Sequence, residues 1–254
     1  MARYKFIVEY DGGSYNGWQT QADGGAVQDA LAKAIHRYCG EAAPMVAAGR
    51  TDAGVHALGQ VVHVDIERGD PADKVRGAVN FHLKPHPIAI LSAERVDESF
   101  HARFDATQRH YLYRIVNRQA PLTLDAGQVW GVRAPLDAGA MHHAAQVLVG
   151  HHDFTTFRAM HCQANSPMRT LDEISVSQYS DEIEVVCRAR SFLHNQVRSM
   201  VGSIKLVGEG KWSVSDLEKA LSAADRTRCG PVAPSDGLYL THVTYGKKPE
   251  AVAS

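Results

Sequence analysis

The sequence lacks any long uninterrupted stretch of apolar residues. No segment approaches the roughly 18 consecutive apolar residues that a membrane-spanning helix requires. Residues 1–5 lead directly into a strand-like segment, without an apolar signal region. We therefore expect a soluble, cytoplasmic protein with no membrane partner.

Cysteine is scarce and widely spaced. The chain has no C-x-x-C pair, and its cysteines lie far apart, at Cys39, Cys162, Cys187 and Cys229. This pattern excludes a disulfide framework and a zinc site built from cysteine. We expect four reduced thiols.

Histidine is abundant, with 14 residues. The pairs His142-His143 and His151-His152 raise the question of a metal site, but the chain contains no H-E-x-x-H motif. Adjacent side chains on a helix point about 100 degrees apart, so neither pair can bind one ion as metalloprotease ligands do. We expect no functional metal.

An excess of basic charge is also missing, because 27 Lys and Arg face 28 Asp and Glu. Nucleic-acid-binding domains often carry such an excess. Locally the balance differs: between residues 101 and 118 a single acid, Asp105, stands against Arg103, Arg109, Arg114 and Arg118. The stretch is either a basic face or a set of scattered surface arginines, and the sequence leaves both interpretations open.

The composition, with 44% hydrophobic and 22% charged residues over 254 positions, is that of a folded protein of one large or two small domains. In the first half the pattern predicts helices over 27–38, ended by Gly40, and from Asp70-Pro71 to Pro85. It predicts strands over 4–10, 45–48 and 88–96, and a half-buried strand over 62–66.

The second half repeats this order. Strands are predicted around 111–115, over 171–177 and 183–190 as a hairpin, and over 238–245. Apolar stripes predict helices over 140–148, capped by Asp137, and over 197–207. Ser213 and Asp216 form a capping box for a further helix.

Each half therefore has the order β-α-β-β-α-β of ferredoxin-like folds, with an extra helix in the second half. We expect an α+β fold of two ferredoxin-like halves side by side, with a mixed or antiparallel sheet, helices on one face and a central cleft. The expected divisions are an N-terminal half over 1–105, a C-terminal half over 106–246 and a disordered tail over 247–254.

The segment Gly49-Arg-Thr-Asp-Ala-Gly-Val-His56 concentrates reactive groups between two strands. As a surface turn, it would have Asp52 bonded to its own backbone. As a site, it would offer Asp52 as a nucleophile or base. It is not a phosphate-binding loop, and the chain also lacks the G-x-G-x-x-G and G-x-S-x-G motifs. Tyr111 and Tyr113, near arginines, suit either base stacking or packing.

The loop Gly49–Ala57 resembles the signature loop of the bacterial tRNA pseudouridine synthase A family. The resemblance continues in order along nearly the whole chain. It includes Glu9-Tyr-Asp-Gly12, Gly17-Trp-Gln19, Phe100-His-Ala-Arg-Phe104, Arg109-x-Tyr111-x-Tyr113, Asp153-Phe-Thr-x-Phe157, Phe192-Leu-His-x-x-Val-Arg198 with Gly202, and Ala233-Pro-x-x-Gly-Leu238. The segment 164–169 departs from the family pattern, which leaves contacts from that loop open.

The resemblance implies an isomerase that needs no cofactor and converts uridine to pseudouridine at about positions 38–40 of the anticodon stem-loop of tRNAs. It also implies a homodimer whose partner subunit helps to hold the tRNA. Asp52 matches the catalytic carboxylate. Whether it attacks C1′, attacks the base or removes the 2′ proton stays open, because each route uses a positioned, ionised carboxylate.

The resemblance further assigns roles around Asp52. Arg198 matches the arginine that forms an ion pair with the nucleophile, and Tyr111 matches the pocket tyrosine, which would stack on the uracil or relay a proton. Leu238 would form part of an apolar floor. Arg50 would fill the space left by a flipped base, and the surrounding arginines, Arg103 and Arg109 among them, would bind phosphates.

Two other functions stay open at this stage. A non-catalytic RNA-binding protein of paired ferredoxin-like units would need the aromatic residues and arginines but not Asp52. A metal-dependent hydrolase ranks third, because the histidine spacing does not support it.

Overall fold

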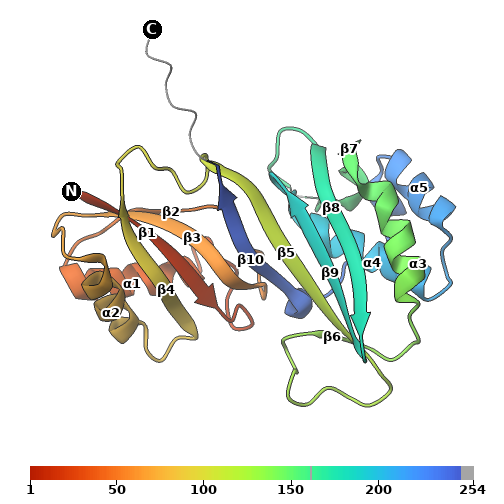
Figure 1. Ribbon diagram of the computed structural model, residues 1–254, viewed down its shortest axis with the longest axis horizontal. Coiled ribbons are helices and arrows are strands. Elements are labelled where there is room, and N and C mark those ends of the chain that lie inside the picture. Colours follow the sequence, from red (N-terminus) through yellow and green to blue (C-terminus); the bar gives the residue numbers. More distant parts are fainter. Residues whose placement is uncertain (161, 247–254) are drawn as a thin grey trace, which may run out of the picture.

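The first half of the chain forms a four-stranded unit with two helices. The computed structural model describes residues 1–160 and 162–246 and shows the predicted order of elements (Figure 1). These are β1 (Ala2–Tyr10), α1 (Val27–Cys39), β2 (Met45–Ala47), β3 (His56–Ile66), α2 (Ala72–Leu83) and β4 (Ile88–Val96). The strands lie in the order β4-β1-β3, and β2 pairs with β3.

The second half forms a similar unit with additional short elements. Its helices are α3 (Ala138–Ala145), α4 (Gln196–Gly208) and α5 (Val214–Ser222). Its strands are β5 (Ala106–Asn117), β6 (Trp130–Val132), β7 (Gly150–Asp153), β8 (Met168–Tyr179), β9 (Glu182–Ala189) and β10 (Leu238–Tyr245). Short 3₁₀ helices lie at Gln146–Leu148, Thr155–Phe157, Arg226–Arg228 and Ser235–Gly237.

The two halves share one ten-stranded mixed sheet, as the sequence predicts. In the strand order β4-β1-β3-β10-β5-β9-β8-β7, each half places its last strand next to its first. The halves meet where β3 and β10 pair in parallel, with Tyr239 opposite His56 and Leu240 opposite Ala57. The last strand of the chain therefore lies between the two halves, directly beside the strand that follows the Asp52 loop.

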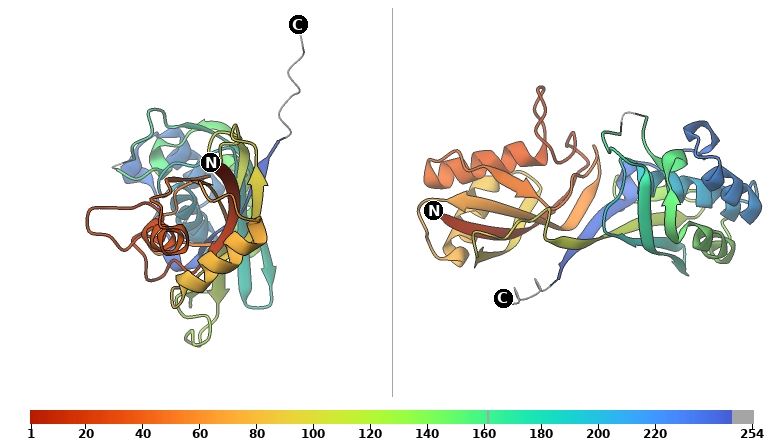
Figure 2. Two further views of the ribbon diagram at one scale, coloured as in Figure 1. Left: turned by 90° about the vertical axis from the view of Figure 1, so that its left-hand side faces the viewer. Right: turned by 90° about the horizontal axis from the view of Figure 1, so that it is seen from above.

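The helices form a layer against this sheet. In the first half α1 and α2 contact each other, and α2 packs on β4. In the second half α3 packs on β8 and on α4. Figures 1 and 2 show α1, α2 and α4 behind the sheet, while the strands face the viewer in Figure 1. One face of the sheet is thus covered, and the middle strands leave the other face open.

Several local predictions are confirmed. Gly40 ends α1 in the left-handed conformation, with φ of 77°. The Asp137 side chain caps α3, and Ser213 and Asp216 form the capping box of α5. The predicted hairpin is β8 paired with β9.

Other local predictions need correction. Strand β3 begins at His56 rather than Val62. Its residues 59–64 are buried on both faces, because the loop after β4 covers the side that we expected to be exposed, whereas Leu58 stays exposed. There the Ala102 amide donates to His63 Nδ1. Helix α2 begins one residue later than expected, since the Asp70 carboxylate binds Lys74 and Tyr38 instead of capping the helix. Strands β6 and β7 were not predicted.

The division at residues 105 and 106 stays a prediction. It falls between Val96, where β4 ends, and Ala106, where β5 begins. The expected tail over 247–254 lies outside the described residues. In the described part of the chain, no helix has the length and apolar character needed to cross a membrane.

Gly202 marks a close approach that the fold requires. A Cβ atom at this position of α4 would lie 1.7 Å from the carbonyl oxygen of Pro231, in the segment that leads to β10. Gly77 in α2 is a matched control, because a Cβ there meets nothing within 4 Å.

We expect Gly202→Ala to destabilise the protein by about 2 kcal/mol, since overpacked cores typically lose 1–3 kcal/mol. Gly77→Ala should raise the stability by about 0.5–1 kcal/mol, because alanine replaces glycine inside a helix. Urea-induced unfolding followed by circular dichroism measures both changes. Equal stability of the two variants would contradict the close approach.

Candidate active site

The loop that carries Asp52 is fixed by contacts from the N-terminal segment. The Trp18 amide donates to the Thr51 carbonyl (3.1 Å), and the hydroxyls of Tyr10 and Thr51 are hydrogen-bonded at 2.8 Å. Gly17 has a positive φ of 92°, and a Cβ there would lie 2.7 Å from the Thr51 carbonyl oxygen. The loop is therefore packed into the fold, which argues against the surface-turn interpretation.

The Asp52 carboxylate faces the second half of the chain. Its side chain is 25% exposed, and Oδ1 lies 3.4 Å from Nε2 of His194. The backbone N–H of Asn195 also favours the ionised form of the carboxylate. The bond of Asp52 to its own backbone, expected for a surface turn, is replaced by contacts with a segment more than 140 residues away.

Burial raises the pKa of Asp52 above the ordinary value for aspartate. The charges of His194 and Arg198 and the N–H of Asn195 oppose this shift, because each favours the ionised form. The carboxylate is therefore only partly accessible to water, and its charge is favoured by groups of the second half.

The segment before α4 is built to present these groups. Asn195, at the N-cap of α4, adopts the left-handed conformation with φ of 61°, which asparagine tolerates better than most residues. The Ala159 amide donates to the His194 carbonyl (2.9 Å), and the Leu193 amide donates to Gln196 Oε1 (2.8 Å). These bonds fix both sides of His194.

Arg198 does not form the direct ion pair that we expected. Its Nε donates to the Ala233 carbonyl (2.7 Å) and its Nη1 to Asn195 Oδ1 (3.2 Å). The guanidinium therefore binds these two oxygens rather than the Asp52 carboxylate. Its charge still lowers the pKa of Asp52. His194 instead lies within ion-pair distance of Asp52. Sequence reasoning missed His194, although it belongs to the Phe192-Leu-His stretch that carries the resemblance.

Tyr111 is buried within the influence of the Asp52 charge, and Leu238 is buried in the hydrophobic core. The Tyr111 ring contacts Phe192 edge-on, with ring centroids 5.2 Å apart. Burial raises the pKa of Tyr111 well above that of free tyrosine, and the Asp52 charge adds to the shift. Tyr111 is therefore a neutral phenol at ordinary pH. Leu238 begins β10 opposite Tyr113 and is 5% exposed.

The predicted role of Arg109 needs correction, because its side chain binds backbone carbonyls and is not free to bind a phosphate. The residue is 9% exposed, and its guanidinium donates to four carbonyl oxygens. These belong to Ala48, Arg103, Ala106 and Arg190. Arg109 thus joins the start of the Asp52 loop to the loop before β5 and to the end of β9.

The other arginines of the predicted basic stretch divide into two groups. Arg114 binds Glu182 at 2.5 Å, and Arg118 binds Asp181 at 3.1 Å, so both charges are compensated. Arg103 is exposed, as is Arg50 beside Asp52. The 101–118 segment is therefore not a continuous basic face.

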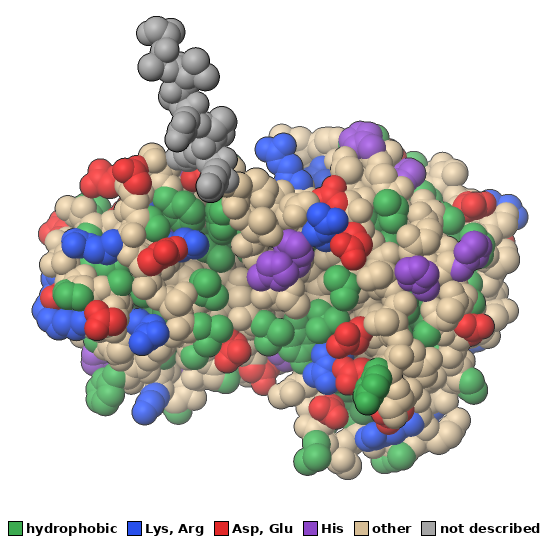
Figure 3. Space-filling model, viewed as in Figure 1, with side chains coloured by type: hydrophobic (Ala, Val, Ile, Leu, Met, Phe, Trp, Pro, Cys, Tyr) green, Lys and Arg blue, Asp and Glu red, His purple; other side chains and the backbone are tan. Residues whose placement is uncertain are grey.

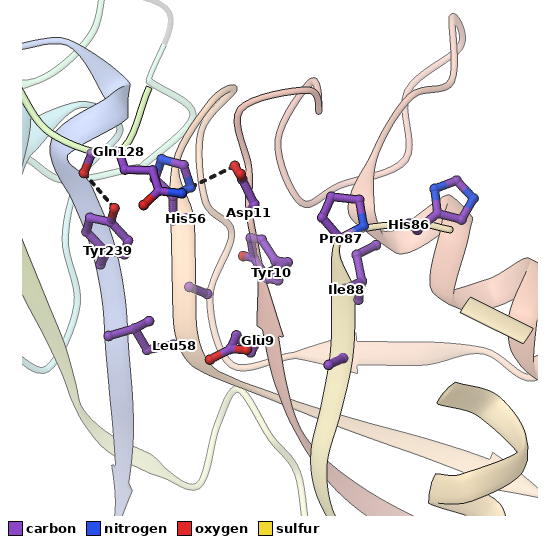
Figure 4. A pocket seen from close by; sticks show the side chains of 12 residues that line it. Glu9, Tyr10, Asp11, His56, Leu58, His86, Pro87, Ile88, Gln128 and Tyr239 are labelled. Carbon is purple, nitrogen blue, oxygen red and sulfur yellow. Dashed lines mark hydrogen bonds and ion pairs between the residues drawn. The ribbon is translucent and has the colours of Figure 1, made fainter. Parts of the chain in front are cut away.

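A hollow of about 470 Å³ lies at the junction of β10 with the first half (Figure 4). His56 lines it, stacks on Tyr239, and places Nδ1 3.0 Å from Asp11 Oδ1. The Gly12 amide lies 3.1 Å from the same nitrogen. Asp52, His194 and Arg198 do not line this hollow. His56 therefore anchors the end of the Asp52 loop to the end of β1.

No resident cofactor is indicated by the side chains that the structure describes. Among residues 1–160 and 162–246, no group of three or more His, Cys, Asp or Glu is arranged to hold a metal ion. The four cysteines are free thiols. A reaction without metal or cofactor stays a prediction.

The chain belongs to the tRNA pseudouridine synthase family, whose model matches residues 6–105 and 144–246. It is similar to proteins named tRNA pseudouridine synthase A. The one from Parvibaculum lavamentivorans is 62% identical over 245 residues, which covers 96% of this chain and all of the relative. The one from Maricaulis maris is 59% identical over 245 residues, covering 96% of this chain and 98% of the relative.

The raised pKa of Asp52 predicts a cost in stability. An acid whose pKa is raised by folding favours folding when protonated, and this stability is lost as the pH rises through the folded pKa. We expect Asp52→Asn to be more stable than the wild type at pH 7. The difference in unfolding free energy between Asp52→Asn and the wild type should narrow below about pH 4, where the aspartate of the unfolded chain is itself protonated.

Urea unfolding midpoints between pH 3.5 and pH 8 test this expectation, with Asp23→Asn in an exposed turn as the control. A variant that is less stable than the wild type at neutral pH would show that the carboxylate is a net stabilising group.

Proposed function

We propose that this protein isomerises uridine to pseudouridine at about positions 38–40 of the anticodon stem-loop of tRNAs. The observation that carries the proposal is the Asp52 carboxylate, which lies in the signature loop, is largely buried and faces His194 and Arg198. Membership of the tRNA pseudouridine synthase family supports the reaction and the class of substrate.

The reaction explains why a carboxylate is needed. The bond between N1 of uracil and C1′ must break, the base must turn, and C5 must bond to C1′. Asp52 is the catalytic residue of this proposal, whether it attacks C1′, attacks the base or removes the 2′ proton. All three routes need the ionised form, which the charges of His194 and Arg198 favour.

The target base must leave the stem before Asp52 can reach its sugar, at a cost of a few kcal/mol. We assign Arg50, exposed beside Asp52, to the space that the base leaves. Tyr111 would stack on the uracil as a neutral phenol, and Leu238 would close the apolar side of the pocket. Arg198 would act through its charge on Asp52.

Phosphate binding falls to exposed arginines around Arg109 rather than to Arg109 itself. The Arg109 guanidinium binds the backbone carbonyls of Arg103 and Arg190, and both side chains are exposed. It also binds the carbonyl of Ala48, two residues before Arg50. One buried arginine thus gathers three exposed arginines close to the Asp52 loop, and these would neutralise phosphates of the tRNA.

We further propose that two copies of the chain associate through the open face of the sheet. Leu58 on β3 and Leu91 on β4 are each 44% exposed. His110 on β5 stacks on His242 on β10, with ring centroids 3.7 Å apart. Figure 3 shows hydrophobic and histidine side chains over the middle of this face. Light scattering distinguishes one copy from two.

A cytoplasmic location also stays a prediction.

The alternative is an RNA-binding protein without catalysis, which would not need Asp52. Release of tritium from C5-labelled uridine in tRNA separates the two, because joining C5 to C1′ expels the hydrogen of C5.

We expect the wild type to release tritium, and Asp52→Asn to release none while it still binds tRNA. Asparagine keeps the size of the side chain but removes the charge on which the reaction depends. The protein should be purified free of host synthases, and tRNA binding should be measured at fixed salt, since phosphate contacts are salt-dependent. Pseudouridine formation by Asp52→Asn would overturn the role of Asp52.

A further inference from the structure

We propose that His194 is the proton-transfer residue for the uracil ring, accepting the proton that C5 loses and supplying the proton that N1 gains. The proposal rests on the proposed function, and it assigns a step that does not depend on which route Asp52 takes.

The proton balance of the reaction requires such a group. When the N1–C1′ bond breaks, its electron pair stays on the uracil. C5 then bonds to C1′ and carries both the sugar and its original hydrogen. The ring recovers its C5–C6 double bond when the C5 proton leaves, and N1 must take up one proton. One imidazolium can deliver a proton to N1 and, once neutral, accept the proton from C5, so no proton is gained or lost overall.

His194 is placed where the turning base would pass. Its Nε2 lies 3.4 Å from Asp52 Oδ1, yet its side chain is 47% exposed while that of Asp52 is 25% exposed. The His194 imidazole is thus more exposed to water than the carboxylate beside it, and a base that approaches Asp52 from solvent would meet this ring. A proton on this ring can exchange with water, so the hydrogen taken from C5 would pass to solvent.

The other titratable and charged groups that face Asp52 are less suited to this step. Arg198 on α4 is a guanidinium, which stays protonated in proteins. Tyr111 on β5 is buried, and its raised pKa disfavours the phenolate that would accept a proton. Asp52 itself is committed to the sugar or base in each route. Imidazole is the side chain that gains and loses a proton near neutral pH.

The local backbone supports a dedicated role for His194. Asn195, the next residue, adopts the left-handed conformation, and its N–H favours the ionised form of Asp52 while its side chain accepts from Arg198. The His194 carbonyl accepts from the Ala159 amide. A non-glycine residue with positive φ is uncommon and is found preferentially at functional sites. This turn at Asn195 brings Nε2 of His194 to 3.4 Å from Asp52 Oδ1.

Two variants separate proton transfer from a purely electrostatic effect on Asp52. His194→Gln keeps a hydrogen-bonding side chain but cannot be protonated. His194→Lys keeps a positive charge beside Asp52 but does not exchange protons near neutral pH as imidazole does. His143→Gln, exposed on α3, is the control for loss of a histidine.

The experiment measures single-turnover pseudouridine formation on a stem-loop RNA with hydrogen or deuterium at C5 of the target uridine. We expect both His194 variants to react about 100-fold more slowly or worse, as is typical when a general acid–base group is removed. Deuterium at C5 should slow the His194→Gln reaction further, because removal of that proton becomes rate-limiting. His143→Gln should match the wild type.

A wild-type rate for His194→Gln, recovery of the rate by His194→Lys, or a slow His194→Gln reaction that is insensitive to deuterium would each overturn the proposal. Circular dichroism and RNA binding confirm that the variants fold, and His194→Asn replaces His194→Gln if the latter does not. Failure of the wild type to form pseudouridine would instead overturn the proposed function.

Discussion

The largely buried carboxylate of Asp52 is the constraint on which the rest of the structure depends. A carboxylate loses hydration when it is buried, and it stays ionised only if charges or N–H groups replace the water. Here the loop of one half supplies the carboxylate, and the segment before α4 in the other half supplies His194, Asn195 and Arg198. The site is thus complete only when the two halves are held together.

The fold meets this requirement at three levels. The parallel pairing of β3 with β10 joins the halves through the backbone. Arg109 links the start of the Asp52 loop to β9 through carbonyl oxygens, and His56 ties the end of the loop to β1. Gly202 lets α4 approach the segment that leads into β10. Each contact fixes the position of Asp52 relative to the cations that face it.

Much of this could be predicted from the sequence. The spacing of apolar residues, typical of strands in some segments and of helices in others, predicted the order of the main elements. The motif around Asp52 identified the loop that carries the carboxylate. Strands β6 and β7 could not be found, because three or four residues are too few to show a period. The burial of His63 depends on a loop whose Ala102 lies 39 residues further along the chain. Arg109 illustrates the same limit, since its sequence neighbours suggested a basic surface and only the tertiary structure shows carbonyl partners.

The contacts of Arg198 show what a motif does not contain. The resemblance named the residue, but the direction of its guanidinium depends on the left-handed Asn195 and on the Ala233 carbonyl. The pH dependence of turnover in Arg198→Leu tests the central claim, with Arg37→Leu on α1 as the control. If Arg198 helps to keep Asp52 ionised, the acid limb of the pH–rate profile moves to higher pH in Arg198→Leu. An unmoved acid limb with a raised Michaelis constant and an unchanged turnover number would contradict the account.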